Sequence, residues 1–176
     1  RWLSFYRSAP DFSEGSRYTQ ATFGYIVPAG TASDGQEGVV DAGARSEFST
    51  LREAIAADAL DNLVEQCGDQ ADVPLQGLHF APTITDPKKI LCVGLNYRAH
   101  QEETGRGGEG VPTVFVRFAA AQMGHGEAMV RPRESASLDF EGEIAMIIGR
   151  GGRRIAHQSA MDHVAGFGIY NDGSVR

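Results

Sequence analysis

The chain has 176 residues, with 16 Lys and Arg against 23 Asp and Glu, a formal net charge of −7 and 41% hydrophobic residues. This length allows one large domain or two small ones, with a real hydrophobic core. The acidic balance argues against nucleic acid and against an anionic membrane surface as partners, because both attract basic proteins. No apolar run approaches the roughly 20 residues of a membrane-spanning helix.

The first residues, "RWLSFYRSAPDF", contain no apolar segment of the kind a secretory signal requires. The two cysteines, Cys67 and Cys92, show neither a CxxC motif nor a metal-type spacing. Two isolated thiols are typical of a reducing compartment. We therefore expect a cytoplasmic protein.

Short strands separated by turn residues are predicted over the first 45 residues. The candidates are "RWLSFYR", "YTQATFGYIV" and "EGVVDAG", with the turn cluster "PAGTASDG" after the second. One amphipathic helix is predicted over residues 49–67, where apolar residues recur at helical spacing: Leu51, Ile55, Ala59, Leu60, Leu63 and Val64. Ser49 or Thr50 can cap its start, and Gly68 follows its end. The prediction for residues 1–85 is a small α/β module.

Residues 68–89 carry three prolines and little periodicity, so they read as a connecting segment. The following segments "KILCVGLNY", "TVFVRFA", "LDFEGEIAMIIG" and "HVAGFGIYND" have strand character, and glycine-rich turns separate them. The turn "GRGGRR" lacks the lysine and hydroxyl of a phosphate-binding P-loop, and no helix pattern follows it. A β-rich second domain over residues 86–176 is therefore predicted, and the whole chain is expected to be a β-rich, mixed α+β protein.

The stretch "SLDFEGEIAMIIG" places Asp139, Glu141 and Glu143 at alternate positions, which lie on one face of an extended strand. Like charges repel and burial raises the cost, so beside the buried-looking run "IAMII" we expect something that compensates these charges. Carboxylate oxygens suit Mg²⁺, Mn²⁺ or Ca²⁺. Glu141 and Glu143 can reach one ion, and Asp172, at the end of the strand "GFGIYND", is the candidate third ligand. The alternative is a solvated strand face, since paired glutamates are common on exposed strands.

Two further groups are candidates for chemistry. His100 and Glu103 would be neighbours on one helical turn, where a carboxylate can orient an imidazole that acts as a general base; the alternative is an exposed surface pair. The loop "TGRGGEG" after them is a candidate lid or a surface loop. Arg117 could bind a substrate carboxylate or extend its stem over the sheet to solvent. Cys92, within an apolar strand, is expected in the core.

The motifs "KILCVGLNYRAH", "VFVRFA", "LDFEGEIAMIIG" and "VAGFGIYNDGSVR" occur in an order that resembles the fumarylacetoacetate hydrolase family, and in particular its 2-hydroxyhepta-2,4-diene-1,7-dioate isomerase-like members. The resemblance covers residues 89–176, and residues 1–88 resemble the variable N-terminal module of many members. It implies a β-roll or sandwich domain and a homodimer. The family continues beyond the position of Arg176, so we expect the C-terminal part of this domain to be missing.

The resemblance also assigns roles to individual residues. It implies that Glu141, Glu143 and Asp172 hold Mg²⁺ or Mn²⁺, and Ca²⁺ is possible in crystals. It implies that His100, oriented by Glu103, is the catalytic base. Substrate-binding roles are assigned to Arg117 and Tyr97, and Asp139 is expected beside the ligands rather than among them.

The expected activity is cleavage of C–C bonds in 1,3-dicarbonyl or 2-oxo acids through a metal-bound enolate. The same enolate chemistry without water gives isomerisation or decarboxylation of hydroxymuconate-type diacids in aromatic catabolism, which is the alternative. A third possibility is a truncated remnant without activity. In each enzymatic case the partner is a small oxo acid.

Overall fold

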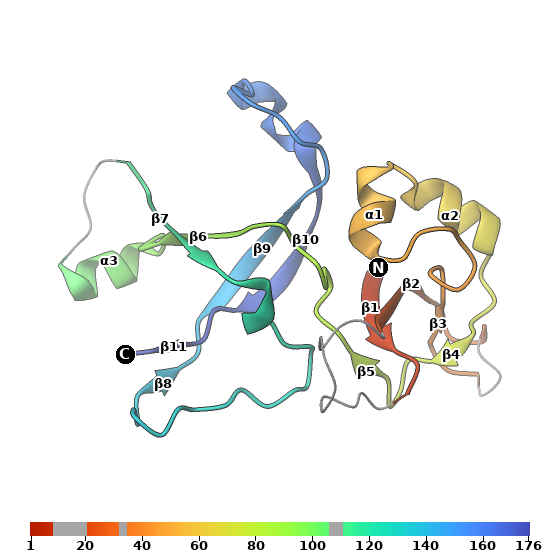
Figure 1. The fold of residues 1–176 in the computed structure, drawn as a ribbon, viewed down its shortest axis with the longest axis horizontal. Helices are drawn as coiled ribbons and strands as arrows, with labels where there is room; N and C mark the ends of the chain where they lie inside the picture. The colour runs from red at the N-terminus through yellow and green to blue at the C-terminus, as the bar shows by residue number, and fades with distance from the viewer. Residues whose placement is uncertain (9–20, 32–34, 106–110) are drawn as a thin grey trace.

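The structure is a computed structural model that describes residues 1–8, 21–31, 35–105 and 111–176, except for the side chains of His100, Glu103 and Thr104. Its fold is mixed α+β and rich in strands. Figure 1 shows a sheet with two helices at one side of the molecule and a group of extended strand pairs at the other. In the described part of the chain, no helix is long and apolar enough to cross a membrane.

The N-terminal module is an antiparallel five-stranded sheet in the order β4-β3-β2-β1-β5. Its strands are β1 (Trp2–Tyr6), β2 (Ala21–Val27), β3 (Gly38–Val40), β4 (Val73–Pro74) and β5 (His79–Phe80). The three strands predicted over the first 45 residues are present. The connecting segment predicted over residues 68–89 is wrong in part, because it supplies both edge strands. Two-residue strands, one of which ends in a proline, are too short to show a period of two.

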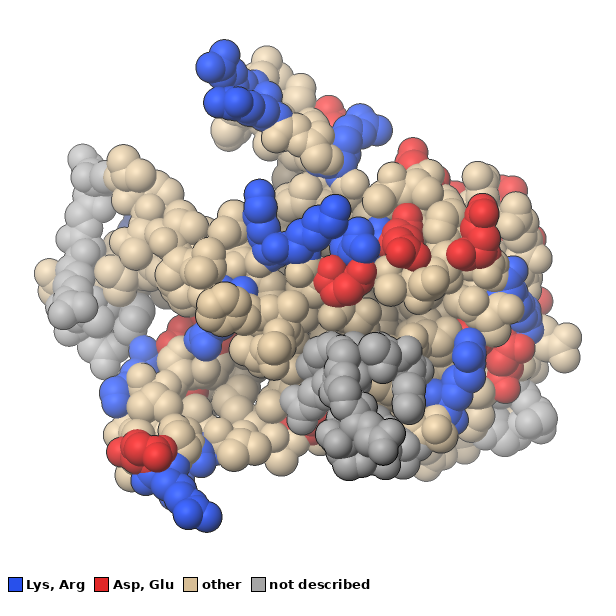
Figure 2. Space-filling view, in the orientation of Figure 1, with Lys and Arg blue, Asp and Glu red and all other residues tan. Residues whose placement is uncertain are grey.

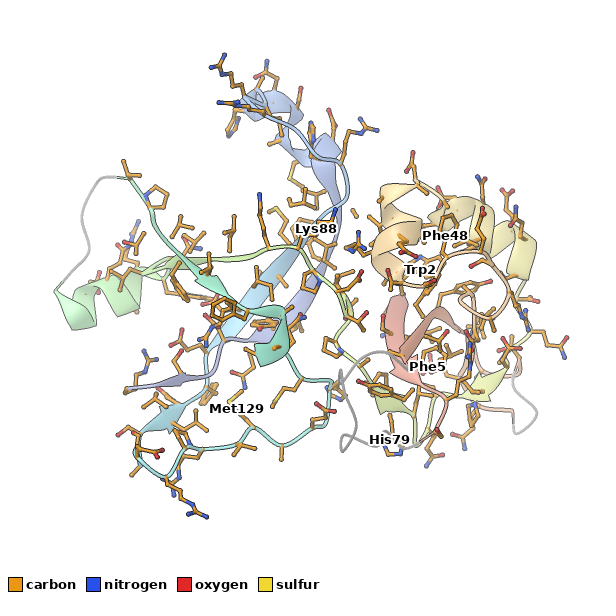
Figure 3. All side chains as sticks on the ribbon, in the orientation of Figure 1. Trp2, Phe5, Phe48, His79, Lys88 and Met129 are labelled. Carbon is orange, nitrogen blue, oxygen red and sulfur yellow. The ribbon has the colours of Figure 1, made fainter. Side chains whose placement is uncertain are left out.

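Both faces of this sheet carry packed side chains because successive strand residues point to opposite sides. On the helix side, Trp2 packs edge-on against Tyr25, with ring centroids 5.0 Å apart. On the other side, Phe5 is fully buried with Leu3 and Val39. Figure 3 shows Trp2 near the helices and Phe5 away from them. The module therefore has two apolar layers on one small sheet.

The single helix predicted over residues 49–67 is two helices, α1 (Leu51–Ala56) and α2 (Leu60–Cys67). The Thr50 side chain caps α1 by accepting a hydrogen bond from the Glu53 amide, and Gly68 ends α2 with φ of 72°. Both predicted ends are therefore confirmed. The break in the middle is the part that the sequence pattern missed.

The break turns both helices toward the same core. In one continuous helix, at about 100° per residue, Leu63 would point about 120° away from Leu51. Asp58 adopts the left-handed region with φ of 55°, a conformation that Asp tolerates better than most residues. Leu51 and Leu63 are both 2% exposed and belong to one cluster. Burial of both leucines therefore overrides continuous helical hydrogen bonding.

The remaining elements form three separate antiparallel pairs: β6 with β7, β8 with β11, and β9 with β10. Their bounds are β6 (Ile90–Gly94), β7 (Thr113–Arg117), β8 (Leu138–Asp139), β9 (Gly142–Ile148), β10 (Val164–Asn171) and β11 (Ser174–Val175). The helix α3 (Arg98–Thr104) follows β6, and short 3-10 helices span Ala119–Ala121 and His157–His163. Residues 106–110 of the predicted lid lie outside the described residues.

The segment "GRGGRR" lies in the long connection between β9 and β10, as the turn interpretation predicted. Arg150, Arg153 and Arg154 are all exposed there. Figure 2 shows basic side chains gathered at this projecting end of the pair. Mutual repulsion of these charges favours their solvation.

The second part of the molecule has no comparable core among its described residues. Every buried hydrophobic side chain described by the structure lies between Leu3 and Ala81. On β9 and β10, Ile144 (74% exposed) faces Ile169 (96%), and Met146 faces Phe167, across the strand pair. The prediction of an interior strand at "IAMII" is therefore wrong in this structure, because β9 pairs with β10 alone and this face of the pair is open to solvent.

Candidate active site

The acidic residues meet where two antiparallel strand pairs join end to end. β8 and β9 follow each other along the chain with two residues between them, and so do β10 and β11. β9 pairs with β10, and β8 pairs with β11. Glu141 lies in one gap and Asp172 in the other. The Asp172 amide donates to the Glu141 carbonyl at 2.9 Å, and the Glu141 amide donates to Oδ1 of Asn171 at 3.0 Å. The gaps therefore place these two carboxylate residues side by side.

This arrangement corrects the simple picture of three carboxylates on one uninterrupted strand face. β8 ends at Asp139 and β9 begins at Gly142. Glu143 lies inside β9, opposite Tyr170. Burial raises the pKa of the Glu143 carboxyl, and the nearby charges of Glu141 and Asp172 raise it further. The three predicted ligands are thus electrostatic neighbours.

Arg117, at the end of β7, is the direct counter-ion of Asp172. Its Nε lies 2.6 Å from Oδ1 of Asp172, whose side chain is only 7% exposed. The same guanidinium donates to Oγ of Ser174 at 2.9 Å. The Ser174 hydroxyl in turn donates to the Asp172 carbonyl at 3.0 Å. One arginine from a distant hairpin therefore fixes both the side chain and the backbone around Asp172.

A second guanidinium neutralises the other end of the acidic row. Nη2 of Arg176 lies 3.0 Å from Oε1 of Glu141, and its Nε lies 3.2 Å from Oδ2 of Asp139. Asp139 thus lies beside Glu141 and shares its counter-ion. Like charges along this segment are tolerated here because Arg117 and Arg176 both face them.

The donor atoms suit a hard divalent cation, since all three candidate ligands are carboxylates. Asp172 Oδ1 and Arg117 Nε are both buried without an aligned hydrogen bond, although they are in contact. Among the residues that the structure describes, however, no group of three or more His, Cys, Asp or Glu side chains is positioned to hold an ion. The residue types therefore fit a cation, while their present arrangement pairs them with arginines.

The residue that precedes α3 contacts this junction. The Tyr97 hydroxyl, at the N-cap of α3, donates to the Gly142 carbonyl at 2.8 Å. Tyr97 therefore anchors the helix to the start of β9. His100 and Glu103 both lie within α3, three residues apart on one helical turn. Their side chains lie outside the described residues, so their roles stay predictions.

Two neighbours of the site were not predicted. Cys92 lies on the face of β6 that carries Arg117 on β7, and burial, followed by the charge of Asp172, raises the pKa of its thiol. The alternation of side chains along β6 could have indicated that Cys92 lies on this face. Met129, labelled in Figure 3, contacts Gly173 so closely that a Cβ there would collide with its sulfur. That contact joins segments 44 residues apart and has no sequence signature.

Comparisons with known proteins identify this α+β chain. The family model described as "Fumarylacetoacetate (FAA) hydrolase C-terminal" matches residues 89–176. The chain belongs to the fumarylacetoacetate hydrolase family, as the motifs predicted.

Among curated relatives, "Oxaloacetate tautomerase FAHD2A, mitochondrial" of Bos taurus is 38% identical over 104 residues, which are 59% of this chain and 33% of that protein. The Xenopus laevis protein "Oxaloacetate tautomerase fahd2, mitochondrial" is 39% identical over 93 residues, which are 53% of this chain and 29% of that protein. The chain spans about a third of the length of these relatives.

Two solved structures have the same fold. A probable 2-hydroxyhepta-2,4-diene-1,7-dioate isomerase from Mycobacterium abscessus aligns with a TM-score of 0.56 and 32% identity over 71% of this chain and 42% of that one. A fumarylacetoacetate hydrolase from Exiguobacterium antarcticum aligns with a TM-score of 0.67 over 99% of this chain and 56% of that one. At 24% identity the second match bears on the fold alone.

Proposed function

We propose that this chain carries the site of a divalent-cation-dependent enzyme that interconverts the keto and enol forms of a small oxo acid. The observation that carries the proposal is the junction of Glu141, Glu143 and Asp172, three coupled carboxylates on two adjoining strand ladders. The names of the relatives support the reaction class, since two are oxaloacetate tautomerases and one is a probable isomerase.

The cation in this proposal is Mg²⁺ or Mn²⁺, held by the same three carboxylates. When bound, such an ion polarises a carbonyl oxygen and stabilises negative charge that develops on it. Glu143 carries a raised pKa because it is half-buried among like charges. A cation would relieve that repulsion, which is a physical reason for these residues to bind one.

Proton transfer is assigned to α3. His100, oriented by Glu103, would take a proton from the carbon beside the keto group and return a proton to the oxygen, so that the enol and keto forms differ only in proton position. Tyr97 and Arg117 are the residues to which we assign binding of the substrate carboxylate. C–C hydrolysis is the second candidate reaction, supported by the name of the family.

Proton NMR of oxaloacetate with the Mg²⁺-supplemented chain tests the proposal, because the same spectra resolve all three reactions. The expected result is faster keto–enol exchange with no new product. A new acetate signal would indicate hydrolysis, with oxalate as the co-product that has no C–H, and a pyruvate signal would indicate decarboxylation; either as the main outcome would contradict tautomerisation.

Glu143→Gln is expected to abolish the acceleration. Glu134→Gln, at an exposed glutamate with no ion pair in the described part of the chain, is the matched control and should leave it unchanged. Full activity in Glu143→Gln would refute the assignment of the site.

A further inference from the structure

We propose that Arg117 competes with the divalent cation for Asp172, so that the guanidinium must give up this carboxylate when the ion binds. The inference rests on the proposed function. It starts from the 2.6 Å contact between Nε of Arg117 and Oδ1 of Asp172. The side chains are 27% and 7% exposed, so water screens the pair only weakly.

The contact occupies one of the two oxygens that the Asp172 carboxylate could offer to a cation. Asp172 Oδ1 is buried and has no aligned hydrogen bond besides its contact with Arg117 in the described part of the chain. A divalent ion that retained the guanidinium beside it would place three positive charges in one poorly screened space. Binding of the ion is therefore favoured by withdrawal of Arg117, and Arg117 lowers the affinity for the ion.

Arg117 has other contacts that can hold it after it releases Asp172. Its Nη2 donates to Oγ of Ser174 at 2.9 Å, and its guanidinium carbon lies 5.9 Å from the centre of the Phe115 ring. A ring face at that distance attracts a cation. A guanidinium held this way has donors free for an anionic group such as a substrate carboxylate. The geometry thus supports an exchange of partners rather than a permanent ion pair.

Arg176 provides an internal comparison. It also pairs with a candidate ligand, Glu141, at 3.0 Å, but its side chain is 43% exposed. Solvent screens an exposed pair, and such pairs contribute little. Loss of one positive charge at Arg176 should therefore change the affinity for the cation much less than loss of the charge at Arg117.

The test is a Mn²⁺ titration of the 176-residue chain and three variants, followed by electron paramagnetic resonance of free Mn²⁺. Arg117→Gln removes the charge and keeps a donor for Ser174, so it should bind Mn²⁺ about tenfold more tightly than the native chain. Arg117→Lys should bind close to the native value because it keeps the charge. Arg176→Gln should change the affinity by less than about threefold.

Each other outcome is informative. If Arg117 only supports the local structure, Arg117→Gln will bind Mn²⁺ equally or more weakly, which overturns the inference while the proposed function stands. If none of the four proteins binds Mn²⁺, both the inference and the proposed function are wrong.

A measurement on the native chain avoids any folding defect of a variant. In a sample with isotope-labelled arginine, the Nε–H resonance of Arg117 should shift as Mg²⁺ is added, because the guanidinium moves away from the Asp172 carboxylate. A resonance that stays unchanged at saturating Mg²⁺ would overturn the inference.

Discussion

Truncation of a buried and an exposed phenylalanine should have very different effects on stability. Phe5 is fully buried between Leu3 and Val39 in the N-terminal sheet, whereas Phe167 on β10 is 56% exposed. Phe5→Ala removes the transfer free energy of the ring and leaves a cavity, which together cost about 3–5 kcal/mol. Phe167 is less than half buried, so Phe167→Ala gives up little buried apolar surface and leaves no enclosed cavity. We therefore expect a loss of roughly 1 kcal/mol or less.

Chemical denaturation followed by fluorescence and far-UV circular dichroism measures both effects. The only tryptophan, Trp2, packs against Phe23 and Tyr25, so its emission reports unfolding of the N-terminal module. Circular dichroism reports the strand pairs as well. If Phe167→Ala destabilised the chain as much as Phe5→Ala, β10 would have a packed core in solution, and the confinement of the core to the N-terminal module would be refuted.

Other variants test particular contacts. Tyr25→Phe removes a buried hydroxyl that donates to the Gly68 carbonyl, so it should cost about 1 kcal/mol at neutral pH. Because burial raises the pKa of Tyr25, its contribution is present below the unfolded value of about 10 and is lost as pH rises through the folded value. Urea unfolding at about pH 7 and about pH 11 should therefore show a larger loss of stability in the native chain than in the variant. Thr50→Ala removes the cap of α1 and should lower the free energy of unfolding by about 1 kcal/mol in the same assay, and no change would show that the cap does not stabilise the module. Gly173→Ala should push Met129 aside and weaken Mn²⁺ binding, with recovery when Met129→Ala is added; failure of the second change to restore binding would contradict the steric explanation.

The N-terminal module was largely predictable because its signals are local. β1, β2 and β3 follow from short strand-like segments bounded by turn residues, and Thr50 and Gly68 mark the helix ends. The break at Asp58 was not predictable from helical spacing, because it depends on a core that both helices share. The edge strands β4 and β5 gain their hydrogen bonds from distant partners, and two residues carry no periodic signal.

The site was predictable in its residue types but not in its pairings. Glu141, Glu143 and Asp172 were expected to be neighbours, and the strand register brings them together. The partnership of Asp172 with Arg117 joins residues 55 positions apart and depends on how two hairpins meet. Two expectations for Arg117 were open from the sequence, a substrate carboxylate and solvent, and its contact with Asp172 is neither.

Burial in the second part was misjudged for a physical reason. An unbroken apolar run such as "IAMII" shows that the residues favour burial, but it does not identify the surface that covers them. Ile144 and Ile169 form such an apolar face on β9 and β10, and both are largely exposed. The faces of a two-stranded pair stay open to solvent unless another element packs on them. The sequence therefore predicted strands correctly and their environment incorrectly.

A thermal melt with and without Mg²⁺, followed by circular dichroism, tests the central claim that the carboxylate junction binds a divalent cation. At about one hundred times its dissociation constant, an ion that binds only the native state stabilises it by about 2.7 kcal/mol. The account predicts a higher melting temperature for the native chain with Mg²⁺ and no shift for Glu143→Gln. An equal shift in both proteins, or no shift in the native chain, would contradict it.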